Sequence, residues 1–175
     1  MNRPGRLLLL LIAGTAEPAL AQVQSEAAVK AAFAVKFGAY VDWPGAKAGS
    51  FPICMVGNDA LGPALERVAA GQQVAGRPVE VRRLAQLTPD SRCAVALVAG
   101  STTQQISSAL AAVAGRPVLT VTDSRWSQVR GMIHFEVVAN RVRFHVDERA
   151  AAASGLAISS KLLALALSVR SRVSR

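Results

Sequence analysis

The sequence predicts an α/β fold in which helices cover both faces of a layered, mostly parallel β-sheet that ends in a C-terminal antiparallel hairpin. Short apolar runs alternate with helical stretches, and the motif "AGRPV" occurs at 75–79 and again at 114–118. Apolar and polar residues alternate on both sides of an Ala-Asn pair within "GMIHFEVVANRVRFHV". Strands that alternate with helices indicate parallel βαβ units, and the alternation about a two-residue turn indicates a hairpin.

The first 21 residues have the layout of a cleaved secretory signal peptide. The basic stretch "MNRPGR" precedes the apolar run "LLLLLIAGTA", and small residues stand before Gln22. The apolar run is shorter than the about 20 residues that a membrane-spanning helix needs. We therefore expect an exported protein that does not span the membrane, with a single domain over residues 22–175.

The predicted mature chain is basic. Removing Arg3, Arg6 and Glu17 changes the formal net charge from +9 to +8. An exported protein meets little nucleic acid, so we expect no nucleic-acid partner. The charge suits an acidic partner domain, or an anionic lipid or glycan, at long range.

The segment "SEAAVKAAFAVKFGAYVDWP" predicts the first helix. Val29, Phe33 and Phe37 recur at helical spacing, and Ser25 is the expected cap. Pro44 limits the helix end, because the residue before a proline is pushed toward extended geometry.

Two similar segments follow, 39 residues apart. Each has an apolar run with a cysteine ("ICMVG", "CAVALVAG"), a helical stretch (about 61–70 and 102–113) and a β-rich run ("PVEVRR", "PVLTVT"). "AGRPV" is also a common way to join a helix to a strand, in which case the offset is coincidental. The βαβ interpretation holds in both cases.

Glycine and proline mark the ends of these elements. Gly76 and Gly115 suit the left-handed position after a helix. Pro78 and Pro117 are tolerated as first residues of a strand. Pro63 suits the first turn of the first of the two helices, and Ser101 or Thr102 the cap of the second.

The hairpin contains both histidines of the chain. A turn at Ala139-Asn140 pairs Glu136 with Arg143 and His134 with His145. One face is expected to enter the core with the side chains of Ile133, Phe135, Val137, Val142, Phe144 and Val146.

The paired histidines raise the alternatives of a metal site and a solvated polar face. Two imidazoles supply half of a tetrahedral zinc site, so Glu136 would have to be the third ligand. The opposing Arg143 should form an ion pair with Glu136, and Arg141 adds more positive charge where a metal cation would bind. We favour the solvated face and expect neither a metal nor a cofactor.

The C-terminal segment "GLAISSKLLALALSVR" predicts a helix that is apolar almost all round. Such a helix is buried on more than one side. It either packs under the sheet or forms a subunit interface.

Cys54 and Cys93 are expected to form one disulfide in an exported protein. Their equivalent places in the two similar segments would put them on adjacent strands, within bridging range. The alternative is two buried free thiols.

No motif for catalysis stands out in the sequence. It contains no G-x-S-x-G, H-E-x-x-H, P-loop or G-x-G-x-x-G, and we expect a protein that is not an enzyme. A ligand crevice would form at loops after strands, around 58–59 and 122–130. The candidate partner or ligand surface comprises Asn58, Asp59, Asp123, Trp126, His134 and His145.

Several of these segments resemble one known family. "VKAAFAVKFGAYVDWP", "ICMVGNDALGPALE", "GRPVLTVTD" and "GMIHFEVVANRVRFHVDERAAAASGLAISSKLLALA" look like the YfiR family of small periplasmic proteins, over residues 27–170. The spacing of Cys54 and Cys93 resembles that of members with a disulfide there. The sequence departs from the family pattern at His134, where asparagine is usual, at Trp126, where phenylalanine is more usual, and in lacking a second glycine before Gly131.

The resemblance implies a periplasmic, non-enzymatic regulator with a Rossmann-like fold that is often a homodimer. The best-known member represses a membrane diguanylate cyclase by binding its periplasmic sensor region, and an outer-membrane lipoprotein relieves the repression. The output is the level of cyclic di-GMP, and through it biofilm formation. The alternative function is a periplasmic small-ligand-binding sensor protein that serves a histidine kinase or a transporter.

Overall fold

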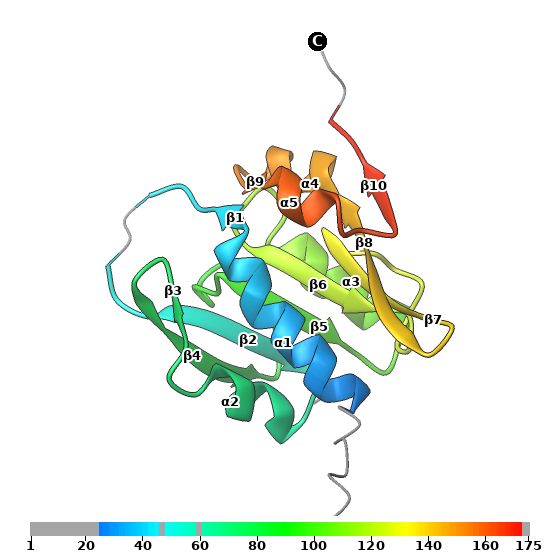
Figure 1. The fold of residues 1–175 in the computed structure, drawn as a ribbon, viewed down its shortest axis with the longest axis horizontal. Helices are drawn as coiled ribbons and strands as arrows, with labels where there is room; N and C mark the ends of the chain where they lie inside the picture. Colours follow the sequence, from blue (N-terminus) through cyan, green and yellow to red (C-terminus); the bar gives the residue numbers. More distant parts are fainter. Residues whose placement is uncertain (1–24, 46–47, 59–60, 173–175) are drawn as a thin grey trace, which may run out of the picture.

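The computed structural model describes residues 25–45, 48–58 and 61–172 (Figure 1). The predicted signal peptide and its cleavage site therefore lie outside the described residues. The helices are α1 (Glu26–Ala39), α2 (Pro63–Ala69), α3 (Thr103–Ala112), α4 (Glu148–Ala153) and α5 (Ser160–Leu163). The strands are β1 (Val41–Asp42), β2 (Phe51–Gly57), β3 (Gln73–Val74), β4 (Arg77–Leu84), β5 (Val95–Ala99), β6 (Leu119–Asp123), β7 (Ile133–Val138), β8 (Arg141–Asp147), β9 (Ala157–Ile158) and β10 (Ser168–Arg170).

The predicted mostly parallel sheet with an antiparallel hairpin is confirmed. In the described part of the chain, eight strands lie in the order β10-β8-β7-β6-β5-β2-β4-β3. The strands from β4 to β7 in this order are parallel, β8 is antiparallel to β7, and β10 is parallel to β8. A small antiparallel pair of β1 and β9, which the sequence did not predict, stands beside the sheet (Figure 1).

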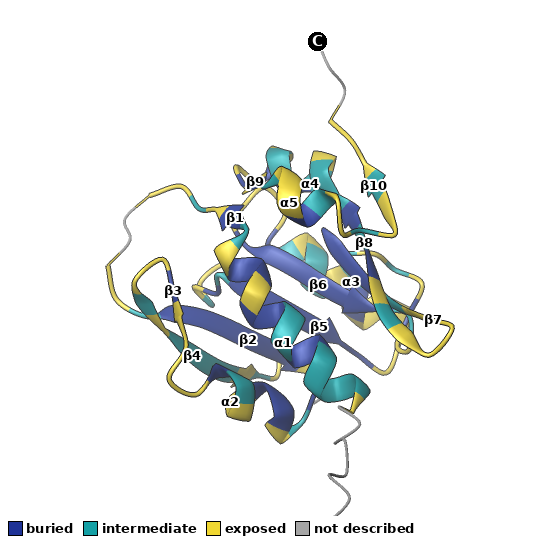
Figure 2. Cartoon of the chain, in the orientation of Figure 1, coloured by how far each residue is buried: buried dark blue, intermediate teal, exposed yellow. Residues whose placement is uncertain are grey.

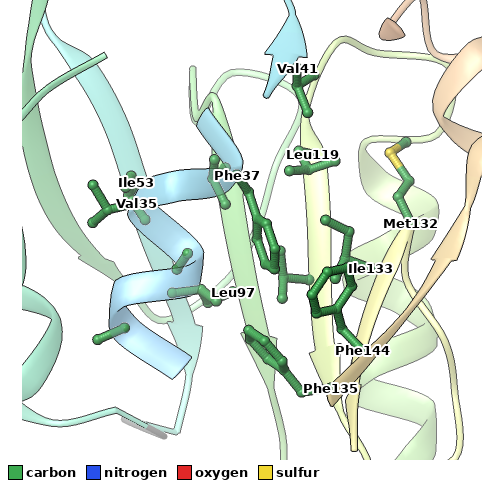
Figure 3. Close-up of a cluster of buried hydrophobic side chains, with 14 of the residues drawn as sticks. Val35, Phe37, Val41, Ile53, Leu97, Leu119, Met132, Ile133, Phe135 and Phe144 are labelled. Carbon is green, nitrogen blue, oxygen red and sulfur yellow. The ribbon is translucent and has the colours of Figure 1, made fainter. Parts of the chain in front are cut away.

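Helices lie on both faces of the sheet, as predicted. α1 crosses the front of the sheet in Figure 1 and α3 lies behind it. The face under α1 carries the larger apolar core, in which Phe37 of α1 contacts Phe135 and Phe144 from the hairpin strands (Figure 3). The central strands are buried along most of their length (Figure 2).

Helix α1 begins as predicted, because the Ser25 side chain accepts the N–H of Ala28. Its buried stripe is rotated by about one residue from the predicted stripe. Lys30, Ala34 and Phe37 are buried, whereas Val29 and Phe33 are only half-buried.

A second, smaller core lies between the sheet and α3. Ile106 of α3 packs there with Cys54 and with the loop that joins β4 to β5. The predicted disulfide between Cys54 and Cys93 is present, with 5.8 Å between the two Cα atoms. Cys54 lies in β2, but Cys93 lies just before β5 rather than within it.

The prediction that the two similar segments form βαβ units is confirmed. Gly76, however, has a different role from the predicted one. It does not follow a helix. With Ala75 it forms the turn between β3 and β4, and both residues have positive φ (50° and 76°). Gly115 does follow α3, at φ 74°, and Thr102 caps that helix.

The predicted C-terminal helix over 155–170 is wrong. This segment forms β9, the single turn α5 and β10. Leu165 and Leu167 are 58% and 40% exposed, so the segment is not buried on more than one side. Backbone groups of the segment bond to other elements instead, because Ser159 N–H donates to the carbonyl of Tyr40 and Leu167 N–H to that of Phe144.

Candidate functional site

The carboxyl ends of β2, β5 and β6 lie together at one edge of the sheet. From β2 the chain passes through α2 to β4 on one side, and from β5 it passes through α3 to β6 on the other. The strand order therefore reverses between β2 and β5. In open α/β sheets, ligands bind outside the carboxyl ends of the strands at such a point.

Asp123, at the end of β6, belongs to a largely buried ionic cluster. Lys30 of α1 is only 2% exposed, and its Nζ lies 2.5 Å from Asp123 Oδ2 and 2.5 Å from Glu26 Oε1. Arg125 Nε lies 3.4 Å from the same Glu26 oxygen. Because a buried ammonium needs charged partners, these contacts tie the start of α1 to the end of β6.

Trp126, three residues after Asp123, lies at the surface beside this cluster. It is 39% exposed and lines a small hollow together with Leu97, Val121 and Phe135. Asp123 lines the same hollow, so the structure brings these two predicted site residues together. The hollow has a volume of only about 20 Å³, which suits the contact of a partner surface better than an enclosed ligand.

The predicted pairing of His134 with His145 is confirmed, and the ring centroids are 6.3 Å apart. The turn is the predicted Ala139-Asn140 pair, with φ of 47° and 59°. Glu136 opposes Arg143 in register, but its carboxylate contacts His145 Nε2 at 2.6 Å instead.

The expectation of a solvated face is wrong for His134, which is 1% exposed. Its Nδ1 lies 2.8 Å from the hydroxyl of Thr122 on β6, and that hydroxyl accepts the N–H of Gly131. The chain around Gly131 comes back along β6, and the N–H of Met132 donates to the Thr120 hydroxyl at 3.1 Å. Burial, and then the charges of Arg130 and His145, lower the pKa of His134, which favours the neutral form of the ring.

The hairpin tip also differs from the prediction. Val137 was expected in the core but is 38% exposed, and Val138 is 41% exposed. The last residue of β6 that pairs with β7 is Asp123, opposite Phe135. The tip therefore projects past the end of β6, and no strand in the described part of the chain lies beside it on that side.

Asn58, at the end of β2, lies apart from Trp126, at a larger cavity of about 460 Å³. Its Nδ2 lies 3.3 Å from the Ser101 hydroxyl, before α3. Sequence reasoning missed most of this cavity, including Gln86 and Gln105. Asp59 lies outside the described residues.

Lys30 was also missed. Its signal was present in the sequence, because Lys30, Ala34 and Phe37 share one helical face and Glu26 stands four residues before the lysine. The prediction placed the apolar stripe on Val29 and Phe33 and so left Lys30 on the solvent side.

Over residues 25–45, 48–58 and 61–172, no group of three or more His, Cys, Asp or Glu side chains is placed to hold a metal ion. No helix in these ranges is long and apolar enough to cross a membrane.

A family model described as YfiR/HmsC-like matches residues 27–167. The chain belongs to this family. YfiR-like proteins are known as periplasmic regulators that in general are not catalysts, which agrees with the resemblance of the sequence. No curated protein matches the chain.

Proposed function

We propose that this YfiR-like protein is a periplasmic negative regulator that binds the periplasmic sensor region of a membrane diguanylate cyclase and lowers cyclic di-GMP. The family match over residues 27–167 carries the proposal. The signal-peptide pattern and the disulfide support an oxidising, exported location. In this proposal an outer-membrane lipoprotein relieves the repression by competing for the regulator.

The proposed mechanism is a shift of population by differential affinity. The regulator binds the inactive state of the sensor region more tightly than the active state, and this difference sets how far the cyclase is inhibited. No bond in a substrate is made or broken.

The proposed docking surface combines Trp126 with the hairpin tip. Trp126, Val137 and Val138 are each about two-fifths exposed and lie at or beyond the carboxyl end of β6. Exposed aromatic side chains are frequent anchors of protein interfaces. Arg141 is exposed directly across from Val138 at the hairpin tip, so a partner that covers the tip should carry an acidic group beside its apolar contact.

The C-terminal edge supports a homodimer as part of the proposal. Leu165 and Leu167 are exposed beside β10, which is the edge strand of the sheet. Sedimentation equilibrium of the wild type and of a Leu165→Glu, Leu167→Glu variant tests this. Dimers are expected for the wild type and monomers for the variant.

The cyclase proposal is tested by measuring binding and output with matched variants. Trp126→Ala should weaken binding to the purified sensor region by about tenfold, the scale of a lost interface anchor. It should also raise cyclic di-GMP in cells that carry the cyclase. Trp126→Phe should retain most of the binding, and Gln73→Ala, exposed on β3 at the far edge of the sheet, should match the wild type.

Failure to recover any membrane cyclase with the wild-type protein, or equal binding by Trp126→Ala and Gln73→Ala, would contradict the proposal. The second candidate, a small-ligand-binding sensor protein serving a histidine kinase or a transporter, is favoured by the cavity beside Asn58.

A further inference from the structure

A cavity lies on the α3 side of the sheet, beyond the carboxyl ends of β2 and β5. Its volume is about 460 Å³, within the range of about 300–1,000 Å³ that is typical of small-molecule sites. It also coincides with the reversal of strand order between β2 and β5, where ligands bind in sheets of this kind.

Two glycines shape the mouth of the cavity. Gly57 ends β2 at φ +79°, and a Cβ built there would lie 2.1 Å from the carbonyl oxygen of Ala99. Gly100 follows β5, and a Cβ there would lie 3.2–3.3 Å from the side chains of Ile106 and Gln105. The absence of side chains at both positions lets the two strand ends and the start of α3 approach one another around an open space.

The cavity combines an apolar floor with a neutral polar rim. Val56, Leu87 and Val98 are buried in its floor, whereas Asn58, Gln86 and Ser108 are exposed at its rim. None of the described lining residues carries a charge. Amide side chains offer both donors and acceptors, and the hydroxyl groups of a sugar do the same.

The start of α3 is already satisfied by its own residues. The Thr102 hydroxyl accepts the N–H of Gln105 at 3.2 Å, and Gln105 Oε1 accepts the N–H of Ser101 at 2.9 Å. These bonds use backbone donors that an anion would otherwise bind. The described lining residues therefore lack the charge and part of the backbone donors that a phosphate or carboxylate ligand would need.

We propose that this cavity binds an uncharged mono- or disaccharide, whose hydroxyl groups meet the rim amides while its C–H faces lie on the apolar floor. The proposal does not depend on the cyclase partner. Among the described residues, the cavity and the hollow beside Trp126 share only Val98 and Ala99. Loss of sugar binding would leave docking at Trp126 unaffected, and the reverse also holds.

The test is a titration of the disulfide-bonded, ¹⁵N-labelled protein, followed by amide chemical shifts. The probes are glucose, N-acetylglucosamine and trehalose, with phosphate and sulfate at matched ionic strength for comparison. The expected result is a saturable shift of the amides of Asn58, Gln86, Gly100 and Gln105 with at least one sugar.

Variants on α3 decide whether the signal arises in the cavity. Ser108→Trp fills the space and should abolish the shifts. Ala111→Trp places the same side chain at an exposed position of α3 outside the cavity and should bind like the wild type. Gln86→Ala, on an exposed loop, should weaken binding several-fold and provides a second variant should Ser108→Trp fail to fold.

Three results would overturn the proposal. The first is that none of the sugars shifts these amides. The second is that Ser108→Trp or Gln86→Ala, once shown to be folded, binds as tightly as Ala111→Trp. The third is that phosphate or sulfate shifts the same amides at lower concentration than every sugar.

Discussion

Removal of the disulfide is the perturbation whose magnitude follows most directly from the structure. Cys54 and Cys93 are 0% and 5% exposed, and the bond closes a loop across a sequence separation of 39 residues. In the chain-entropy description, a loop of this length lowers the entropy of the denatured chain by about 13 cal/mol/K, or ~4 kcal/mol at 25 °C. Natural domains have unfolding free energies of about 5–15 kcal/mol, so the disulfide supplies a large share of the unfolding free energy.

The expected result is that Cys54→Ala, Cys93→Ala and the double variant each lose about 4 kcal/mol of unfolding free energy, because either single change removes the whole bond. For a domain of this size the melting temperature should fall by roughly 8–16 °C, at about 2–4 °C per kcal/mol. Urea denaturation followed by circular dichroism measures the free energy. The wild type under a thiol reductant should behave like the double variant.

A loss below about 1 kcal/mol in all three variants would refute the reasoning, since the loop-closure entropy would then be absent. Losses in the single variants that add up to the loss in the double variant would also refute it. That outcome would assign the stability to the packing of two separate sulfur atoms in the core under α3.

Two other predictions concern buried polar groups. Lys30→Met leaves the Asp123 carboxylate largely buried without its lysine partner, so the variant should lose about 3–5 kcal/mol of unfolding free energy. Lys30→Met combined with Asp123→Asn should lose clearly less than the sum of the two single changes. Urea denaturation measures these free energies, and strict additivity would contradict the prediction. The pKa of His134 is lowered on folding, so the unfolded chain binds more protons and stability should fall as the pH drops below about 6.5, until the lowered pKa is passed. His134→Asn should make stability less dependent on pH across that window, and an unchanged difference between the unfolding free energies at pH 7 and pH 5 would contradict the assignment.

The hairpin could be predicted from the sequence because its turn and its alternation of side chains involve residues that are close together in the chain. The Ala139-Asn140 turn sets the register, and the alternation of side chains then fixes which residues share a face. The same reasoning could not show that His134 is buried. The His134 side chain is buried by Thr122 and by the backbone near Gly131. The position of that backbone depends on how the long connection between β6 and β7 returns along the sheet.

The failed prediction of a C-terminal helix has a similar cause. Leucine-rich spacing favours a helix, yet the segment finds backbone partners on β1 and β8, and tertiary pairing overrides a weak local preference. Lys30 was missed although its helical face and the nearby Glu26 were visible in the sequence. The sequence did not show that the distant Asp123 lies 2.5 Å from the ammonium and so allows it to be buried.

The burial of His134 limits what the hairpin can present to a partner. His145 is also engaged, since Glu136 contacts its Nε2 and Ser168 its Nδ1, each at 2.6 Å. Neither ring is therefore available without breaking contacts within the protein. Arg141 and Arg143 are exposed on this part of the hairpin, and the side chain of Glu136 is 40% exposed beside them, so recognition at the tip should depend on charge as well as on an apolar contact. Such an interaction is steered at long range and weakens as salt rises, whereas recognition through histidine would vary mainly with pH.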